Sequence, residues 1–291
     1  MTEILAIAPF FSVSLLLALS CFLLLRAGEI SFGQQAFFAV GAYGGGCITA
    51  LFEWPLIGAL VIASLVGAFG ALMVSPMLVR LGGFRFTLAT LVLGEWVQEV
   101  LTKVRLVRTV NGRDVGPDGP LGFSGIDYFT RQSWSLYDQA LLNLCFAMVA
   151  TAALVLALRG SGGRHLAAVA QDPGLASSIG INPLRVRRLA IVASGALAGL
   201  GGGLFAHDSS FIDPTNFSLM SGVHAVAYTL LGGVGSVAGP VIGTAVDIIL
   251  LEGLRITGSY RMVAFGCLLV LGLILLPGGF VGRRPTRGRY G

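Results

Sequence analysis

The stretch that decides the fold is ILAIAPFFSVSLLLALSCFLLL, residues 4–25, which contains no Asp, Glu, Lys or Arg. A helix needs about 20 predominantly apolar residues to cross the hydrocarbon core of a bilayer. No basic region precedes this stretch and no cleavage site follows it. We therefore expect a retained membrane helix and not a signal peptide.

The same bias extends over all 291 residues, of which 55% are hydrophobic and 11% charged, with a mean hydropathy of +0.85. Soluble domains carry about 25% charged residues, so this composition excludes a soluble or a disordered chain. The net charge of +5 comes from basic residues scattered among loops, without the basic face that nucleic-acid binding requires. We expect an all-α, polytopic transmembrane bundle of about eight to nine helices.

The apolar segments give the candidate spans. Six are regular, at 4–25, 36–52, 56–79, 136–158, 189–207 and 260–276. Segment 87–101 is short and carries two glutamates, and segment 219–254 is interrupted by a glycine-rich sequence that indicates two helices meeting at a break. Helices are expected throughout because lipid-exposed backbone must satisfy its own hydrogen bonds.

Arginine and lysine set the expected orientation. Loop 159–188 carries five arginines and the tail 283–291 carries four, so both are expected to be cytoplasmic. Loop 102–135 is then external, and its many turn-forming residues predict an ordered loop. We expect residues 1–282 to form a single transmembrane domain in the inner (cytoplasmic) membrane.

The loop 159–188 contains the pattern of a helix outside the membrane. Asp172 followed by Pro173 is typical of a helix N-terminus, and Gly180 of a helix end, which predicts one short helix at about 173–179. Two interpretations stay open: a helix resting on the membrane surface, or a coupling helix that docks on an ATPase. The chain has no G-x-x-x-x-G-K-[ST] loop, so a separate chain would have to hydrolyse ATP.

Two glycine-rich breaks form a second pattern: GEISFGQQAFFAVGAYGGG at 28–46 and LGGVGSVAGPVIG at 231–243. Paired interruptions indicate a duplicated, pseudo-symmetric fold whose broken helices line a transport path. Close helix packing through glycine is the alternative. The residues expected along such a path are Ser31, Gly33, Gln34, Gly41, Glu95, His224, Gly232, Gly233, Ser236 and Gly239.

Ionisable residues inside apolar segments are expensive and usually face the bundle interior, which is the position we expect for Glu95. Glu99 and Lys103 predict an interfacial pair one helical turn apart. His224 is more typical of a buried structural histidine than of a ligand. The sequence has no nucleophile elbow, no HExxH and no clustered metal ligands. We therefore expect no enzymatic activity, no cofactor and no metal in this chain.

Five strings carry a resemblance to a known family. They are GEISFGQQAFFAVGAY (28–43), RLGGFRFTLATLVLGE (80–95), GPDG (116–119), GRHLAAVAQDPGLASSIGIN (163–182) and LLGGVGSVAGPVIG (230–243). In this order the chain resembles, over about residues 15–282, the permease subunits of branched-chain amino acid ABC importers. The resemblance favours the coupling-helix interpretation of 164–180. The coupling residues it implies are Arg164, Ala168, Gln171, Asp172, Pro173, Ala176 and Gly180.

The resemblance also implies partners: a second permease subunit, similar or identical, two cytoplasmic ATPases that hold ATP and Mg, an external solute-binding protein and membrane lipids, with no nucleic acid. The solute would be small and polar, a branched-chain or other amino acid. Relatives that carry urea, short amides or aromatic acids leave it open, and this chain has His224 where a carboxylate is expected. The rival from another class is a self-sufficient secondary transporter or channel, driven through Glu95 or Asp247.

Overall fold

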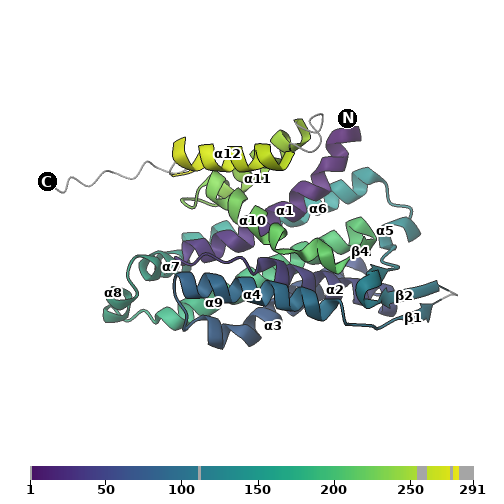
Figure 1. Cartoon of the computed structure of the whole chain (residues 1–291), viewed down its shortest axis with the longest axis horizontal. Coiled ribbons are helices and arrows are strands. Elements are labelled where there is room, and N and C mark those ends of the chain that lie inside the picture. The colour runs from purple at the N-terminus through teal and green to yellow at the C-terminus, as the bar shows by residue number, and fades with distance from the viewer. Residues whose placement is uncertain (1, 111–112, 254–260, 276–277, 282–291) are drawn as a thin grey trace.

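The computed structural model describes residues 2–110, 113–253, 261–275 and 278–281, and most of them are helical (Figure 1). Nine helices of the described part have 14 residues or more. They are α1 (Thr2–Arg26), α2 (Gln34–Phe52), α3 (Leu56–Leu78), α4 (Phe84–Leu101), α6 (Leu136–Arg159), α9 (Pro183–Ser209), α10 (Leu219–Gly232), α11 (Ala238–Gly253) and α12 (Arg261–Leu275). The all-α polytopic bundle is thereby confirmed.

Five helices, α1, α2, α3, α6 and α9, are long and apolar enough to cross a membrane. The predicted segment 87–101 begins earlier, at Phe84, as α4. Segment 219–254 divides, as expected, into α10 and α11 on either side of residues 233–237. The predicted tail at 283–291 lies outside the described residues.

Helix α9 stands at the centre of the bundle and packs against α1, α2 and α3. Its glycines allow this close approach. A Cβ on Gly199 would lie 2.5 Å from the carbonyl oxygen of Ala63 and 3.0 Å from Cα of Gly67, both on α3. Small residues at helix interfaces are typical of membrane bundles, where packing replaces the hydrophobic effect as the cause of association.

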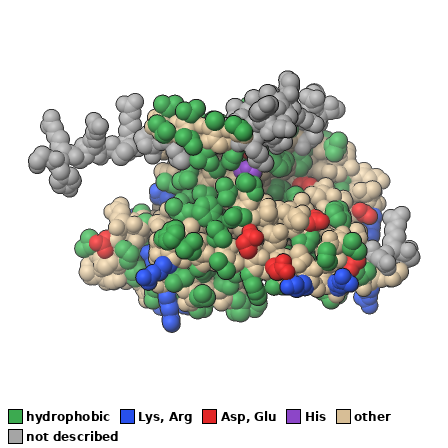
Figure 2. Space-filling model, in the orientation of Figure 1, with side chains coloured by type: hydrophobic (Ala, Val, Ile, Leu, Met, Phe, Trp, Pro, Cys, Tyr) green, Lys and Arg blue, Asp and Glu red, His purple; other side chains and the backbone are tan. Residues whose placement is uncertain are grey.

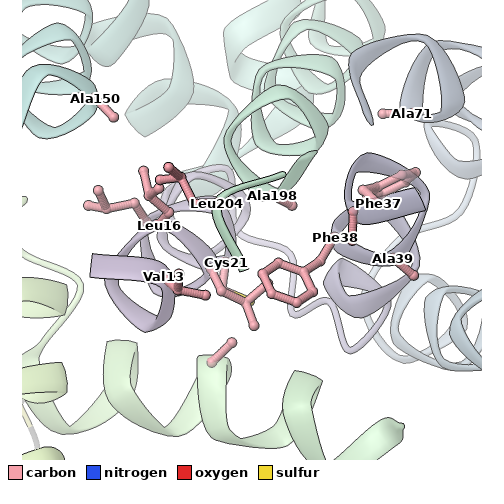
Figure 3. Packing of buried hydrophobic residues seen from close by; sticks show 14 of the residues in the cluster. Val13, Leu16, Cys21, Phe37, Phe38, Ala39, Ala71, Ala150, Ala198 and Leu204 are labelled. Carbon is pink, nitrogen blue, oxygen red and sulfur yellow. The ribbon is translucent and has the colours of Figure 1, made fainter. Parts of the chain in front are cut away.

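The apolar core lies between these helices (Figure 3). Side chains of α1, including Leu16 and Cys21, meet Phe38 of α2 and Leu204 of α9 there. Phe38 also lies 5.7 Å from Phe217, between ring centroids, which extends the core toward the segment that precedes α10. The core thus fixes α1, α2 and α9 as a unit, against which the other helices are placed.

Both glycine-rich breaks lie at the end of the bundle that carries the helices of loop 159–188. The first break, residues 27–33, follows α1, and a Cβ on its Gly28 would lie 3.1 Å from Cα of Ala170. The second break, residues 233–237, contacts the end of α1, where Arg26 Nη1 donates a hydrogen bond to the Val234 carbonyl oxygen at 3.5 Å. Because arginines gather here, we call it the cytoplasmic end.

The opposite end carries a small sheet that the sequence analysis did not predict (Figure 1). Its antiparallel strands are β1 (Arg108–Val110), β2 (Arg113–Pro117), β3 (Phe123–Ser124) and β4 (Phe211–Ile212), in the order β1-β2-β3-β4. Phe123 pairs with Ile212, and both are fully buried. The sheet therefore joins loop 102–135 to the segment that follows α9.

The outer surface is apolar. Large hydrophobic side chains are exposed along α3, α4 and α6, among them Leu65, Met77, Val92, Trp96 and Met148. Hydrophobic side chains extend across the face shown in Figure 2, and the Lys and Arg side chains lie along its margins. An exposed apolar surface of this extent requires lipid or another membrane chain to cover it.

Candidate functional site

The cytoplasmic loop contains a short helix with the predicted ends, α8 (Pro173–Ser178). The Asp172 Oδ1 accepts hydrogen bonds from the N–H groups of Gly174 at 2.7 Å and Leu175 at 3.0 Å. At the other end Gly180 has a φ of +84°, a conformation that favours glycine and ends a helix. The N-cap and the stop read from the sequence are confirmed.

A second helix, α7 (Ser161–Gln171), precedes α8, so the prediction of a single helix in this loop is wrong. The N-cap residue of α7 is Gly160, which provides no side-chain hydrogen bond. The start of α7 therefore lacks the kind of capping signal that marks the start of α8. The available signal is the spacing of three buried residues, Gly163, Leu166 and Val169, on one face of the helix.

The exposed side of α8 differs from the expected one. Ala176 is only 2% exposed because α8 packs against α7 and α9. The expectation that Ala176 faces a docking partner is therefore wrong. Leu175 and Ile179 are 68% and 72% exposed and stand one helical turn apart. Of the other coupling candidates, Ala168 is half-buried and the following are exposed: Arg164, Gln171, Asp172, Pro173 and Gly180.

The first break contains a buried ion pair that the sequence analysis missed. Glu29 is 3% exposed, and its Oε1 lies 2.9 Å from Nη2 of Arg187 on α9. Its Oε2 accepts a hydrogen bond from the Gly83 N–H at 3.0 Å, at the start of α4. Burial raises the pKa of the Glu29 carboxyl, while the Arg187 guanidinium and the Gly83 N–H act in the opposite direction.

Two further hydrogen bonds attach the first break to α4. Thr87 Oγ1 donates to the Ile30 carbonyl oxygen at 2.9 Å, and the Phe32 N–H donates to Thr90 Oγ1 at 3.3 Å. Gly33 must be glycine because a Cβ there would collide with the Thr90 carbonyl. The break is therefore a defined joint between α1, α2 and α4.

Two buried glutamines follow the break at the start of α2. Gln34 donates from Nε2 to Ser31 Oγ at 3.4 Å, but its Oε1 has no hydrogen-bond partner among the described residues. Gln35 is fully buried, and neither its Oε1 nor its Nε2 has a partner in the described part of the chain. Gly94 of α4 and Gly222 of α10 make room for its amide. An unsatisfied buried amide is costly, so we treat Gln35 as a candidate functional residue.

The second break is closed by backbone contact between glycines. A Cβ on Gly232 would collide with the carbonyl oxygen of Gly239, and a Cβ on Gly239 with that of Gly233. Phe280 packs beside this break, where its N–H donates to the carbonyl oxygen of Leu231, near the end of α10, at 3.0 Å. Ser236 Oγ is buried, with no partner among the residues that the structure describes.

Two of the path candidates lie differently from the other residues of that set. Gly41 is buried where α2 crosses α9, and a Cβ on it would collide with the Gly199 backbone, which suits the alternative of close helix packing. Glu95 is exposed on the outer face of α4, beside Trp96, because the inward face of α4 holds Thr90 and Gly94. The expectation that Glu95 points into this chain's bundle is therefore wrong.

Other predicted residues lie where their chemistry suggests. Glu99 and Lys103 form the expected ion pair, with 2.9 Å between Oε1 and Nζ. His224 is half-buried between aromatic rings: it stacks on Tyr228 at 6.0 Å between centroids and meets the Phe265 ring at 4.6 Å. These ring contacts suit a structural histidine.

A polar cluster near the external end was also missed. Fully buried His207 contacts the Gly203 carbonyl oxygen through Nδ1 at 2.6 Å and Thr49 Oγ1 through Nε2 at 3.0 Å. The neighbouring Asp208 accepts two hydrogen bonds from Asn143 Nδ2, at 2.8 and 3.0 Å. Thr49 also lines an external cavity of about 250 Å³. These residues hold α2, α6 and α9 together, and within the described residues no three His, Cys, Asp or Glu side chains are grouped as metal ligands.

Comparison with known proteins decides the family. The model of the family described as "Branched-chain amino acid transport system / permease component" matches residues 3–276. This chain belongs to that family. The match covers all five long apolar helices, both breaks and the loop 159–188. The resemblance read from the sequence is confirmed, and with it a multi-pass protein of the inner membrane.

Individual relatives are also branched-chain amino acid permease proteins. The high-affinity branched-chain amino acid transport system permease protein LivM of Salmonella typhimurium is 28% identical over 272 residues, 88% of this chain and 64% of LivM. LivM of Escherichia coli gives the same values, and LivH of Escherichia coli is 35% identical over 138 residues, 46% of this chain and 44% of LivH. This chain thus spans less than two thirds of LivM's length. No solved structure matches it.

Proposed function

We propose that this chain is the transmembrane permease subunit of an ATP-driven, binding-protein-dependent importer of a small polar solute, a branched-chain or other amino acid. Its family and the names of its relatives support this proposal. ATP and Mg would be held by two separate ATPase subunits, and an external binding protein would deliver the solute. Urea, short amides and aromatic acids are the alternative solutes that the family resemblance leaves open.

The observation that carries the proposal is the surface of α8. This helix is capped at both ends, stands outside the long apolar helices and presents Leu175 and Ile179 to solvent. Two exposed apolar side chains one turn apart are the anchors that a helix uses in a partner's groove. A helix resting on the membrane would be held by an arginine-flanked apolar face in the same way, so the experiment must separate the two partners.

Movement of α8 would reach the membrane through α9. Residues 179–182 join the two helices, and Asn182 Oδ1 accepts a hydrogen bond from the Arg185 N–H at 3.1 Å, which fixes the start of α9. Because α9 packs against α1, α2 and α3, a shift at its cytoplasmic end is passed to the bundle core. ATP binding can drive such a shift only by favouring one of two arrangements through its own contacts.

The outer face of α4 supports the proposal of a second permease subunit. Glu95 is exposed there between Val92 and Trp96, which are 63% and 62% exposed. A carboxylate that faced acyl chains would cost several kcal/mol, about 2.5–3.5 kcal/mol at a helix centre by insertion scales. A neighbouring chain, or water enclosed between two chains, would remove this cost. We therefore place Glu95 at the contact with the second permease.

The test uses the permease purified with its ATPase subunits and reconstituted in vesicles. Replacing both exposed residues, Leu175→Asp with Ile179→Asp, should weaken ATPase copurification and lower ATP-driven uptake by at least about tenfold, as loss of interface anchors does. The control is Leu121→Asp, because Leu121 is 74% exposed at the external end. That variant should retain its ATPase subunits.

Three outcomes have defined meanings. Loss of the ATPase subunits from the α8 variant alone supports the coupling role. Full retention with normal uptake would mean that α8 rests on the membrane. Uptake by the wild-type permease without ATP would favour the rival, a secondary transporter or channel.

A further inference from the structure

The ion pair between Glu29 and Arg187 joins three segments that are far apart in sequence. Glu29 lies in the first break, Arg187 in the first turns of α9, and Gly83, which donates its N–H to Glu29, at the start of α4. The side chains of Glu29 and Arg187 are 4% and 19% exposed. The pair is therefore largely withdrawn from water at the point where the three segments meet.

This arrangement contributes little as a device for stability. A buried ion pair must offset the desolvation of both charges, and it does so well only when every remaining donor and acceptor is satisfied. Here Arg187 Nε is buried and has no hydrogen-bond partner among the described residues. Replacing a buried ion pair by apolar residues of similar volume is often neutral or stabilising, so stability alone does not account for these charges.

The pair stands directly beside the two cytoplasmic helices. Arg187 lies on α9 five residues after Asn182, which caps that helix and ends the segment leading from α8. On the other side, the backbone at Gly28, next to Glu29, packs closely on Ala170 of α7, at a distance that leaves little room for a side chain on Gly28. The first break is thus held by α7 through packing and by α9 through charge.

From the break, the contacts continue into the membrane. Its backbone is hydrogen-bonded to Thr87 and Thr90 of α4, and it leads directly into the start of α2 with Gln34 and Gln35. A displacement of α9 that kept the ion pair intact would therefore move the break, α4 and the buried glutamines together. Without the pair, α9 could move past them.

We infer that Glu29 and Arg187 are positioning residues that transmit movement of the cytoplasmic helices to the first break and α4. This inference rests on the proposed function. The pair would couple ATP hydrolysis to a change at the solute path, and neither residue would contact solute or nucleotide. Loss of the pair should therefore affect two measurable quantities differently. ATP hydrolysis should continue, whereas solute uptake per ATP hydrolysed should fall.

The decisive variant is the double substitution Glu29→Gln with Arg187→Met in the complete complex, because it leaves no unpaired buried charge. We expect normal copurification of the ATPase subunits and continued hydrolysis stimulated by loaded binding protein. Uptake per ATP should fall about tenfold, within the 5–150-fold range usual for coupling between sites. Arg187→Lys, which keeps the charge, should restore part of the coupling.

The matched control is Arg188→Met, which removes the same charge from an exposed neighbour and should leave uptake per ATP unchanged. A double variant with wild-type uptake per ATP would overturn the inference. So would a double variant that inserts poorly but whose inserted fraction has wild-type uptake per ATP, because the pair would then be purely structural. If the double variant does not insert at all, Arg187→Lys decides alone: wild-type uptake per ATP overturns the inference, and a lowered value supports it. ATP-independent uptake by the wild type would contradict the proposed function itself.

Discussion

The two glycine-rich breaks look alike in sequence and differ in physics. The first, residues 27–33, is held by polar groups: Glu29 pairs with Arg187, and the break is hydrogen-bonded to α4. The second, residues 233–237, accepts one long side-chain hydrogen bond, from Arg26 to Val234, and is closed mainly by shape, because the backbones of Gly232 and Gly239 touch and leave no room for a Cβ. A serine followed by glycines therefore does not specify one kind of joint.

The difference suggests different duties. A joint held by an ion pair and hydrogen bonds can exchange partners in another state, whereas a joint closed by glycine contacts can only stay closed or open as a whole. We expect the first break to move during transport and the second to act as a fixed seam, beside which Phe280 packs. The predictions below test this division.

The largest effect is expected at the seam. Gly239→Leu should prevent folding of the chain, since its side chain would have to displace the Gly233 carbonyl; overpacking costs about 1–3 kcal/mol even where side chains can adjust. The measurement is the monodisperse fraction after detergent extraction. Gly266→Leu on α12 is the control, because among the described residues no atom outside its own stretch of helix lies within 4 Å of its Cβ position. A well-folded Gly239→Leu permease would show that the seam is open.

A smaller effect is expected at the first break. Gly33→Ala places a methyl group against the Thr90 carbonyl, and we expect a cost of about 1–3 kcal/mol together with loss of uptake in a chain that still inserts. Thermal unfolding and vesicle uptake check the two parts. Gly70→Ala on α3, whose nearest neighbour is a Phe37 ring carbon at 3.8 Å, should be normal in both. Normal uptake by Gly33→Ala would remove the first break from the moving parts.

These comparisons also show what the sequence could and could not predict. Apolar runs predict the long helices, and Asp172 with Gly180 predicts both ends of α8, because these signals are local. The face of α8 is not local: α7 and α9 turn Ala176 inward and Leu175 outward. Helix α7 lacks a capping side chain and so escapes the same reasoning.

The ion pair illustrates the limit for sites. Glu29 and Arg187 are separated by most of the chain, and only the fold brings their side chains to 2.9 Å. Glu95 shows a second limit. Its apolar sequence context predicts that the carboxylate is shielded from lipid, but it is exposed on this chain, so the shielding must come from outside it. The strands β3 and β4 have two residues each, too few for an alternating pattern to be recognised.

Gln35, buried just after the first break, gives a third prediction. Gln35→Leu removes an amide whose polar atoms have no partner among the described residues, so we expect the free energy of unfolding to rise by about 1–3 kcal/mol. Uptake should fall, because a costly polar group is retained where function requires it. Thermal unfolding and uptake are measured together, with Gln34→Leu for comparison. A destabilised Gln35→Leu would mean that the amide is satisfied after all.

The smallest effects come from the two serines that make the breaks look alike. Ser31 Oγ accepts hydrogen bonds from the Gly33 N–H at 3.3 Å and from Gln34 Nε2 at 3.4 Å, so Ser31→Ala leaves two buried donors unpaired. We expect a loss of about 1 kcal/mol in unfolding free energy. Ser236 Oγ has no partner among the described residues, and Ser236→Ala should be neutral or slightly stabilising. Each alanine variant lacks one hydroxyl oxygen relative to the wild type. Comparing the thermal unfolding of the two variants therefore isolates the contribution of each hydroxyl. If Ser236→Ala proved the more damaging, the second break would be a polar joint as well, and the contrast between the two breaks would be lost.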